Sequence, residues 1–209
     1  MKYKLIIFDL DGVICDSPKL VNDFFMNMFP TMTQEHANEI LCGNFHDELE
    51  KFKLTNKKIE ETPEEEEMRR NKYMRDKENI PLYDGIKELL EKLRNSGCIV
   101  AINTSALEKN TLPVLEKTKI RGFIDFIACA EVSKSKVEKF KIIQEKYKVA
   151  KEEIVFVTDT LGDIREADIS GIPTITVTYG AHNTSFLTRE HHENLIAVVN
   201  SVSELGDLL

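Results

Sequence analysis

Two pairs of aspartates, each following a short apolar run, are the residues best suited to chemistry in this sequence. Asp9 and Asp11 follow the first apolar run of the chain, and Asp159 and Asp163 follow a later one. Carboxylates that gather at one point repel one another unless a cation lies among them. All-oxygen ligands of this kind suit a hard ion such as Mg²⁺. The pattern predicts a magnesium site, provided that the fold brings the two pairs together.

A pair of hydroxyls and a lysine occupy comparable positions. Thr104 and Ser105 end the apolar run at 99–103, and Lys136 opens an amphipathic stretch. A lone aspartate after a strand is most often a helix cap or a turn residue. Four aspartates in two such clusters, with hydroxyls and a lysine, favour a functional site instead.

Short apolar runs alternate with amphipathic stretches through most of the chain. The runs are β-branched or aromatic and are bounded by polar or turn residues, which is typical of buried strands. We expect strands at 3–8, 99–103, 123–129, 154–158, 174–178 and 196–199, and helices between them at 84–95, 136–147 and 163–170. This alternation predicts an α/β fold with a doubly wound, Rossmann-like parallel sheet. Ligands of such sheets bind beyond the carboxyl ends of the strands, so every polar cluster should face one crevice.

Residues 17–80 break this alternation and predict an all-helical insertion, with helices at 18–28, 34–41, 46–52 and 63–76. The last helix has a clear start, because Thr62 and Glu65 can form a capping box and Pro63 suits the first turn. The acidic run at 64–67 is therefore interpreted as a solvated helix start and not as a metal site. Two i,i+4 ion pairs are expected on this helix, Glu65–Arg69 and Glu66–Arg70. The apolar residues expected to form the core of the insertion are Phe24, Phe25, Met28 and Phe29.

Composition narrows the class of partner. The chain of 209 residues is 42% hydrophobic and 31% charged, with a net charge of -8, which argues against binding nucleic acid or an anionic membrane. The four cysteines are scattered, so neither a zinc site nor a disulfide framework is expected. No apolar segment has the length of a membrane span, and a cytoplasmic location is the expectation.

The order of the motifs resembles that of the haloacid dehalogenase-like hydrolases, whose members are mostly phosphatases. Residues 8–14, Phe-Asp-Leu-Asp-Gly-Val-Ile, resemble the first motif, and residues 100–105 resemble the second. Lys136 resembles the third motif and residues 155–163 the fourth. The match spans nearly the whole predicted core. Thr158 departs from the family pattern, which usually has glycine at this place.

The resemblance implies a role for each motif residue. Asp9 would attack phosphorus and Asp11 would act as general acid and base, while Gly12 allows a tight turn. Thr104 or Ser105 and one lysine, Lys136 or its neighbour Lys134, would bind the phosphoryl group. The implied Mg²⁺ ligands are Asp9, the carbonyl of Asp11, Asp159, and Asp163 directly or through water.

The resemblance also implies a catalytic core at 1–15 and 82–209 and a helical cap at 16–81. The expected substrate is a small phosphorylated metabolite, and the expected assembly is a monomer or small homo-oligomer. A phosphomutase acting on a sugar phosphate stays open as an alternative, as does a non-enzymatic phospho-aspartate signalling protein. Two histidines, His46 and His182, are left open between substrate contact and a surface role.

Overall fold

The computed structural model describes residues 2–209 and contains, within them, one parallel sheet of six strands. The strands are β1 (Leu5–Phe8), β2 (Ile99–Asn103), β3 (Phe126–Ala128), β4 (Ile154–Thr158), β5 (Thr174–Val177) and β6 (Leu195–Val199). Their spatial order is β3-β2-β1-β4-β5-β6, which places β1 between β2 and β4. This is the doubly wound arrangement that the alternation of apolar runs predicted.

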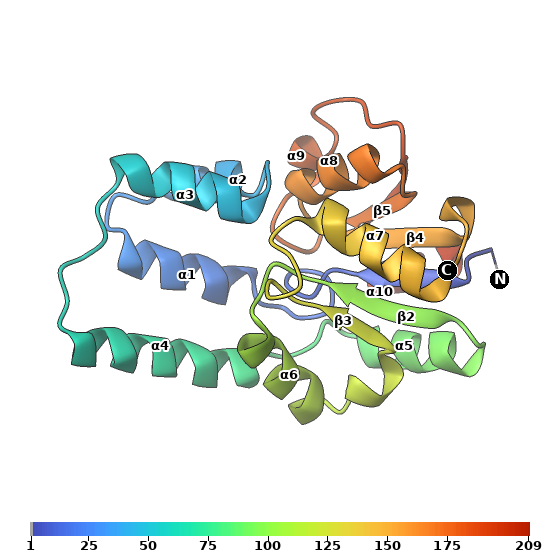
Figure 1. The fold of residues 1–209 in the computed structure, drawn as a ribbon, viewed down its shortest axis with the longest axis horizontal. Coiled ribbons are helices and arrows are strands. Elements are labelled where there is room, and N and C mark those ends of the chain that lie inside the picture. The colour runs from blue at the N-terminus through green and yellow to red at the C-terminus, as the bar shows by residue number, and fades with distance from the viewer. Residues whose placement is uncertain (1) are drawn as a thin grey trace.

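Helices cover both faces of the sheet (Figure 1). On one face, α5 (Ile86–Asn95), α6 (Glu108–Lys117) and α10 (Val202–Leu208) pack against alternate strand residues such as Ile6 and Phe8. On the other face, α7 (Lys136–Tyr147) and α8 (Leu161–Ser170) pack against Leu5 and Ile7. The strands are therefore buried on both sides, which explains why they are continuous apolar runs. The remaining core elements are α9 (Thr184–Leu187) and the 3₁₀ turns Arg121–Phe123 and Lys151–Glu153.

The insertion after β1 consists of α1 (Pro18–Met28), α2 (Gln34–Ile40), α3 (Phe45–Thr55) and α4 (Pro63–Glu78). These helices lie together at one side of the sheet, at the left of Figure 1. Phe29, Met32, Ile40 and Leu49 are the buried centre of their own small core. Phe25 and Met28 pack against this cluster as expected, whereas Phe24 makes a tilted ring contact with Tyr73 of α4, with ring centroids 4.3 Å apart.

Two local expectations need correction. The capping box of α4 is present, but its Glu65 side chain turns back to the Thr62 N–H. Arg69 consequently pairs with Glu61 at 2.6 Å and not with Glu65, while Glu66 and Arg70 do approach each other, at 3.8 Å. Helix α6 was not among the helices named from the sequence, and Pro113 lies inside it. Proline lacks an N–H and weakens the helix pattern.

Within residues 2–209, no helix combines the length and the apolarity needed to cross a membrane.

Candidate active site

The carboxyl ends of three neighbouring strands place the candidate residues together. Asp9 follows β1, Thr104 follows β2 and Asp159 follows β4. The Asp9 N–H donates to the Val157 carbonyl at 2.9 Å, which ties the first motif to the fourth. A cavity of about 510 Å³ opens at this edge of the sheet. The predicted residues that line it are Asp9, Asp11, Thr104, Ser105, Lys136, Asp159 and Asp163.

A buried lysine stands between two of these carboxylates. Lys136 is 1% exposed, and its Nζ lies 3.1 Å from Asp9 Oδ2 and 2.5 Å from Asp163 Oδ2. The side chain starts at the first residue of α7, whose N-cap is Ser135. Of the two lysines considered from the sequence, Lys136 is therefore the one that contacts the aspartates, and Lys134 is exposed.

Thr158, the residue that departs from the family pattern, has a specific contact here. Its hydroxyl donates to Asp163 Oδ2 at 2.6 Å, the same oxygen that Lys136 approaches. Asp163 is thus held by a lysine and a threonine inside the protein. The hydroxyl takes part in fixing this carboxylate, which a glycine could not do.

The carboxylates of Asp9 and Asp159 lie in an environment that disfavours two bare negative charges. Burial raises the pKa of Asp9 to about 6, although Lys136 opposes that rise. Burial, followed by the charge of Asp9, holds the pKa of Asp159 well above its ordinary value. Each shift means that a nearby positive charge would stabilise the ionised pair.

The fit of Mg²⁺ can be judged from the same atoms. Asp159 Oδ2 accepts from the Ala181 N–H at 2.7 Å, but Asp159 Oδ1 is buried without a hydrogen-bond partner among the described residues. Gly12, at φ +78°, passes so close that a Cβ there would lie 1.8 Å from Asp159 Oδ2. In residues 2–209 no three His, Cys, Asp or Glu side chains are grouped as a metal site. Mg²⁺ in proteins usually keeps several water ligands. A site of two carboxylates and a backbone carbonyl, with water as the remaining ligands, nevertheless fits this ion.

Asp11 is held by two residues that sequence reasoning missed. Its Oδ1 accepts hydrogen bonds from the Ser17 hydroxyl and from the ammonium of Lys77. Lys77 is fully buried near the end of α4, so the insertion delivers a cation to the first motif. Burial lowers the pKa of Lys77 to about 7, and the charge of Asp9 opposes this. No local pattern marks Lys77, because it is one of many charged residues on a polar helix.

Lys139 is a second overlooked lysine. It is fully buried on α7, one turn after Lys136, and donates to the Thr104 carbonyl at 2.6 Å. Burial and the charge of Lys136 lower its pKa to about 8. Lys139 thereby fixes the end of β2 beside the cavity. Its i+3 spacing from Lys136 is the signal that could have indicated it.

The insertion is bound to α8 through its segment 41–44. The Gly162 N–H donates to the Leu41 carbonyl at 2.9 Å, and Arg165 donates to the Cys42 carbonyl at 2.5 Å. The Asn44 side-chain amide donates to Glu166 Oε1 at 3.1 Å. These bonds hold the segment over the edge of the sheet that carries the aspartates.

His182 adds a further link between insertion and sheet. Its Nδ1 accepts from the Leu161 N–H at 3.1 Å, and its Nε2 lies 3.0 Å from the Asn38 carbonyl. The side chain is 1% exposed, so it is neither at the rim of the site nor on the surface. His46, by contrast, does line the cavity, and its Nε2 is buried without a hydrogen-bond partner among the described atoms.

We expect Gly162→Ala to destabilise the protein by about 1–3 kcal/mol, the usual cost of overpacking. A Cβ at this position would lie 2.1 Å from the Gly43 carbonyl oxygen, so the segment 41–44 has to move and lose its bonds to α8. Urea denaturation would measure the change in the free energy of unfolding. Gly122→Ala is the matched control, since a Cβ there meets nothing within 4 Å. Equal stability of the two variants would show that this close approach is unimportant.

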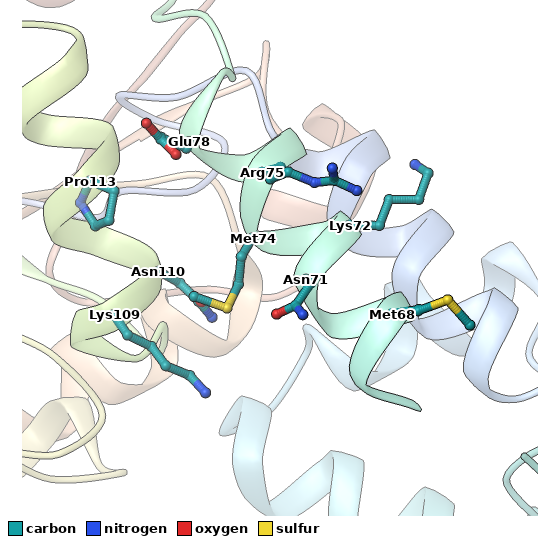
Figure 2. A pocket seen from close by; sticks show the side chains of 9 residues that line it. All are labelled: Met68, Asn71, Lys72, Met74, Arg75, Glu78, Lys109, Asn110 and Pro113. Carbon is teal, nitrogen blue, oxygen red and sulfur yellow. The ribbon is translucent and has the colours of Figure 1, made fainter. Parts of the chain in front are cut away.

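A second hollow adjoins the cavity. This groove of about 740 Å³ lies between α4 and α6, and Figure 2 shows its side chains. Met74, Lys109 and Asn110 line both hollows. These three residues therefore lie between the cavity and the groove.

The sheet order, the aspartates at its edge and the buried lysine define a Rossmann-like α/β protein with a carboxylate-based site. Residues 6–177 match the family model described as haloacid dehalogenase-like hydrolase, and the chain belongs to that family. It is 27% identical to the tyrosine-protein kinase PtkA of Mycobacterium tuberculosis, covering 99% of this chain and 72% of that protein. It is 26% identical to a phosphoglycolate phosphatase of Vibrio parahaemolyticus, covering 99% of this chain and 96% of that protein.

The fold is shared with solved structures. The structure of CbbY from Rhodobacter sphaeroides in complex with phosphate superposes with a TM-score of 0.77 at 19% identity, covering 98% of this chain and 96% of that one. This likeness confirms the expected Rossmann-like architecture.

Proposed function

We propose that this phosphatase hydrolyses small phosphate monoesters with Mg²⁺ through an aspartyl-phosphate on Asp9. The observation that carries the proposal is the contact of Asp9 Oδ2 with the buried Lys136, beside Asp11 in one cavity. The family is one of hydrolases, and several relatives are named phosphatases. A carboxylate fixed next to a cation at the end of a cavity is suited to nucleophilic attack on phosphorus.

In the first step an oxygen of Asp9 forms a bond to phosphorus, and the bond from phosphorus to the alcohol oxygen breaks. The electron pair goes to the leaving oxygen, which takes a proton from Asp11. Lys136 offsets negative charge on the transferring group, and the hydroxyls of Thr104 and Ser105 lie at the end of β2 to contact its oxygens. Ser17 and Lys77 hold the Asp11 carboxyl in place for the transfer.

In the second step water attacks the phosphorus of the aspartyl-phosphate and gives its proton to Asp11. The bond from phosphorus to Asp9 breaks, which restores the carboxylate and releases inorganic phosphate. One residue thus acts first as acid and then as base. Asp9, Asp159 and the Asp11 carbonyl would hold Mg²⁺, with Asp163 reaching it through water. The metal would supply charge stabilisation for the phosphoryl oxygens.

We also propose that residues 16–81 act as the cap, and that residues 1–15 and 82–209 are the catalytic core. Closure of α1–α4 over the aspartates excludes bulk water from the aspartyl-phosphate. The bonds from segment 41–44 to α8 support this, because they hold the insertion over the cavity. No contact among residues 2–209 specifically favours the phosphomutase alternative.

Release of inorganic phosphate from a panel of small phosphate monoesters tests the function. We expect turnover with Mg²⁺ that disappears on chelation and returns when Mg²⁺ is added back. A thermal melt with and without the ion provides a readout independent of activity, since a ligand that binds the folded state raises Tm. Absence of turnover across the panel, with an intact fold, would contradict the proposal.

Lys77→Met is expected to impair the proton transfer at Asp11. We expect kcat/KM for an alkyl phosphate to fall about 10²-fold, the lower end of what general acid catalysis contributes. An aryl phosphate should lose less, because its leaving oxygen is a weaker base and needs the proton less. Parallel kinetics on the two esters measure this difference. Lys72→Met, which removes an exposed lysine from the same helix, is the control. Equal losses on both esters would indicate a structural role alone.

A further inference from the structure

The cavity has two chemically different ends. The end at the sheet carries the aspartates and Lys136, whereas the opposite end is built from the insertion. Four aromatic residues line that second end: Phe24, Phe25, Phe45 and Tyr73. They come from three helices, α1, α3 and α4. Each ring is half-buried, so it keeps one part of its surface toward the cavity.

The rings form a connected set. The centroids of Phe24 and Tyr73 are 4.3 Å apart, those of Phe24 and Phe25 are 5.3 Å apart, and those of Phe25 and Phe45 are 5.6 Å apart. Tilted and edge-on contacts of this kind also suit a further ring placed beside them. The four rings thus form an aromatic wall of the cavity, against which a flat apolar group can pack.

The core of the insertion accounts for only part of this wall. Phe25 and Phe45 pack against the buried cluster of Phe29, Met32, Ile40 and Leu49, whereas neither Phe24 nor Tyr73 belongs to it. Apolar surface that faces a water-filled cavity is unfavourable, and a ligand that covers it removes that cost. The rings therefore point to an apolar group on the ligand.

The charged side chains near this end are exposed or already paired. Arg69 lies 5.1 Å from the centroid of the Phe24 ring and pairs with Glu61. Arg70, Lys109 and Lys134 line the cavity but are exposed side chains. Lys136 is already engaged by Asp9 and Asp163. A small anionic leaving group would find mostly aromatic surface here and would leave much of the 510 Å³ unfilled.

We propose that the alcohol part of the substrate carries a flat, mainly apolar ring that packs among Phe24, Phe25, Phe45 and Tyr73. This inference rests on the phosphatase function proposed above and names its substrate class, phosphate monoesters of ring-bearing alcohols. Met74 and Asn110 lie between this end of the cavity and the groove between α4 and α6 (Figure 2). Asn110 Oδ1 is buried there without a hydrogen-bond partner among the described residues. It can accept from a donor on the far side of the ring.

The test compares kcat/KM for 1-naphthyl phosphate and for phosphoglycolate, a small open-chain ester. Phe24→Leu and Tyr73→Leu each remove a ring from the wall while keeping an apolar side chain. We expect each to lower the ratio of naphthyl to open-chain kcat/KM on the order of tenfold, mainly through KM. The difference in intrinsic reactivity between the two esters cancels, because the same ratio is compared across variants.

Phe52→Leu is the matched control. Phe52 is also a half-buried aromatic residue of the insertion, but it packs on Phe29 and is not among the residues that line the cavity. We expect it to leave the ratio unchanged. If the ratio falls equally in all three variants, or in none, the proposed ring site is overturned. Hydrolysis of phosphoglycolate would still support the phosphatase function in that case. If the wild-type protein hydrolyses neither ester, the proposed ring site is overturned. Absence of turnover across the whole panel of monoesters would overturn the phosphatase function as well.

Discussion

Asp9→Asn is expected to reduce phosphatase turnover by about 10⁴- to 10⁶-fold, the loss seen when a nucleophile is removed. The amide has nearly the same shape but cannot attack phosphorus as a carboxylate does. The negative charge of Asp9 repels that of Asp159 and contributes to the raised pKa of Asp159. The substitution removes this repulsion, so we expect the fold to persist. Phosphate release measures the loss, and intact mass after an acid quench detects the aspartyl-phosphate in the wild type.

The control for this substitution is Asp23→Asn. Asp23 is an exposed aspartate on α1 that pairs with Lys19, and it has no part in the proposed reaction. We expect it to retain full turnover and to form the phosphoenzyme. Undiminished turnover in Asp9→Asn would show that the nucleophile is another group and would remove the basis of the proposed mechanism.

Lys136→Met is expected to damage both stability and activity. Without the ammonium, Asp9 and Asp163 lose their cationic partner inside the protein. Breaking a buried ion pair in this way costs about 3–5 kcal/mol. Turnover should fall about 10²- to 10³-fold, as it does when one group that stabilises transferring charge is lost. Urea denaturation measures the first effect, and phosphate release under stabilising conditions measures the second.

Lys134→Met tests whether the site needs Lys136 itself or only a positive charge nearby. Lys134 lies two residues earlier and is exposed, and it also lines the cavity. We expect little change in the free energy of unfolding, because exposed charges contribute about 1 kcal/mol or less. If Lys134→Met proved as damaging as Lys136→Met, the assignment of the phosphate-binding lysine would have to be reversed.

Much of the core could be predicted because its signals are local. Each buried strand is a short apolar run, and Asp9 and Asp159 stand immediately after two of them. Parallel strands bring such positions to one edge whatever the distance along the chain. Helix α7 was predicted with its observed bounds for the same reason, since its amphipathic pattern lies within the segment itself.

What sequence reasoning missed depends on contacts between distant segments. Lys77 meets Asp11 across 66 positions, and His182 meets Asn38 across 144. Each residue looks ordinary where it stands in the chain. Helix α6 was not named from the sequence either. It contains Pro113, which disfavours a helix locally, and Val114 and Leu115 anchor it in the core beneath the sheet.

The sequence by itself determined which residues are available for chemistry and which edge of the sheet they occupy, because periodicity and capping act over a few residues. Only the tertiary structure decided which lysine contacts Asp9, which cation holds Asp11 and which aromatic side chains of the insertion face the cavity. Those outcomes depend on how separate helices pack against the sheet. The energy of a buried charge or an exposed ring is set by neighbours that arrive only on folding.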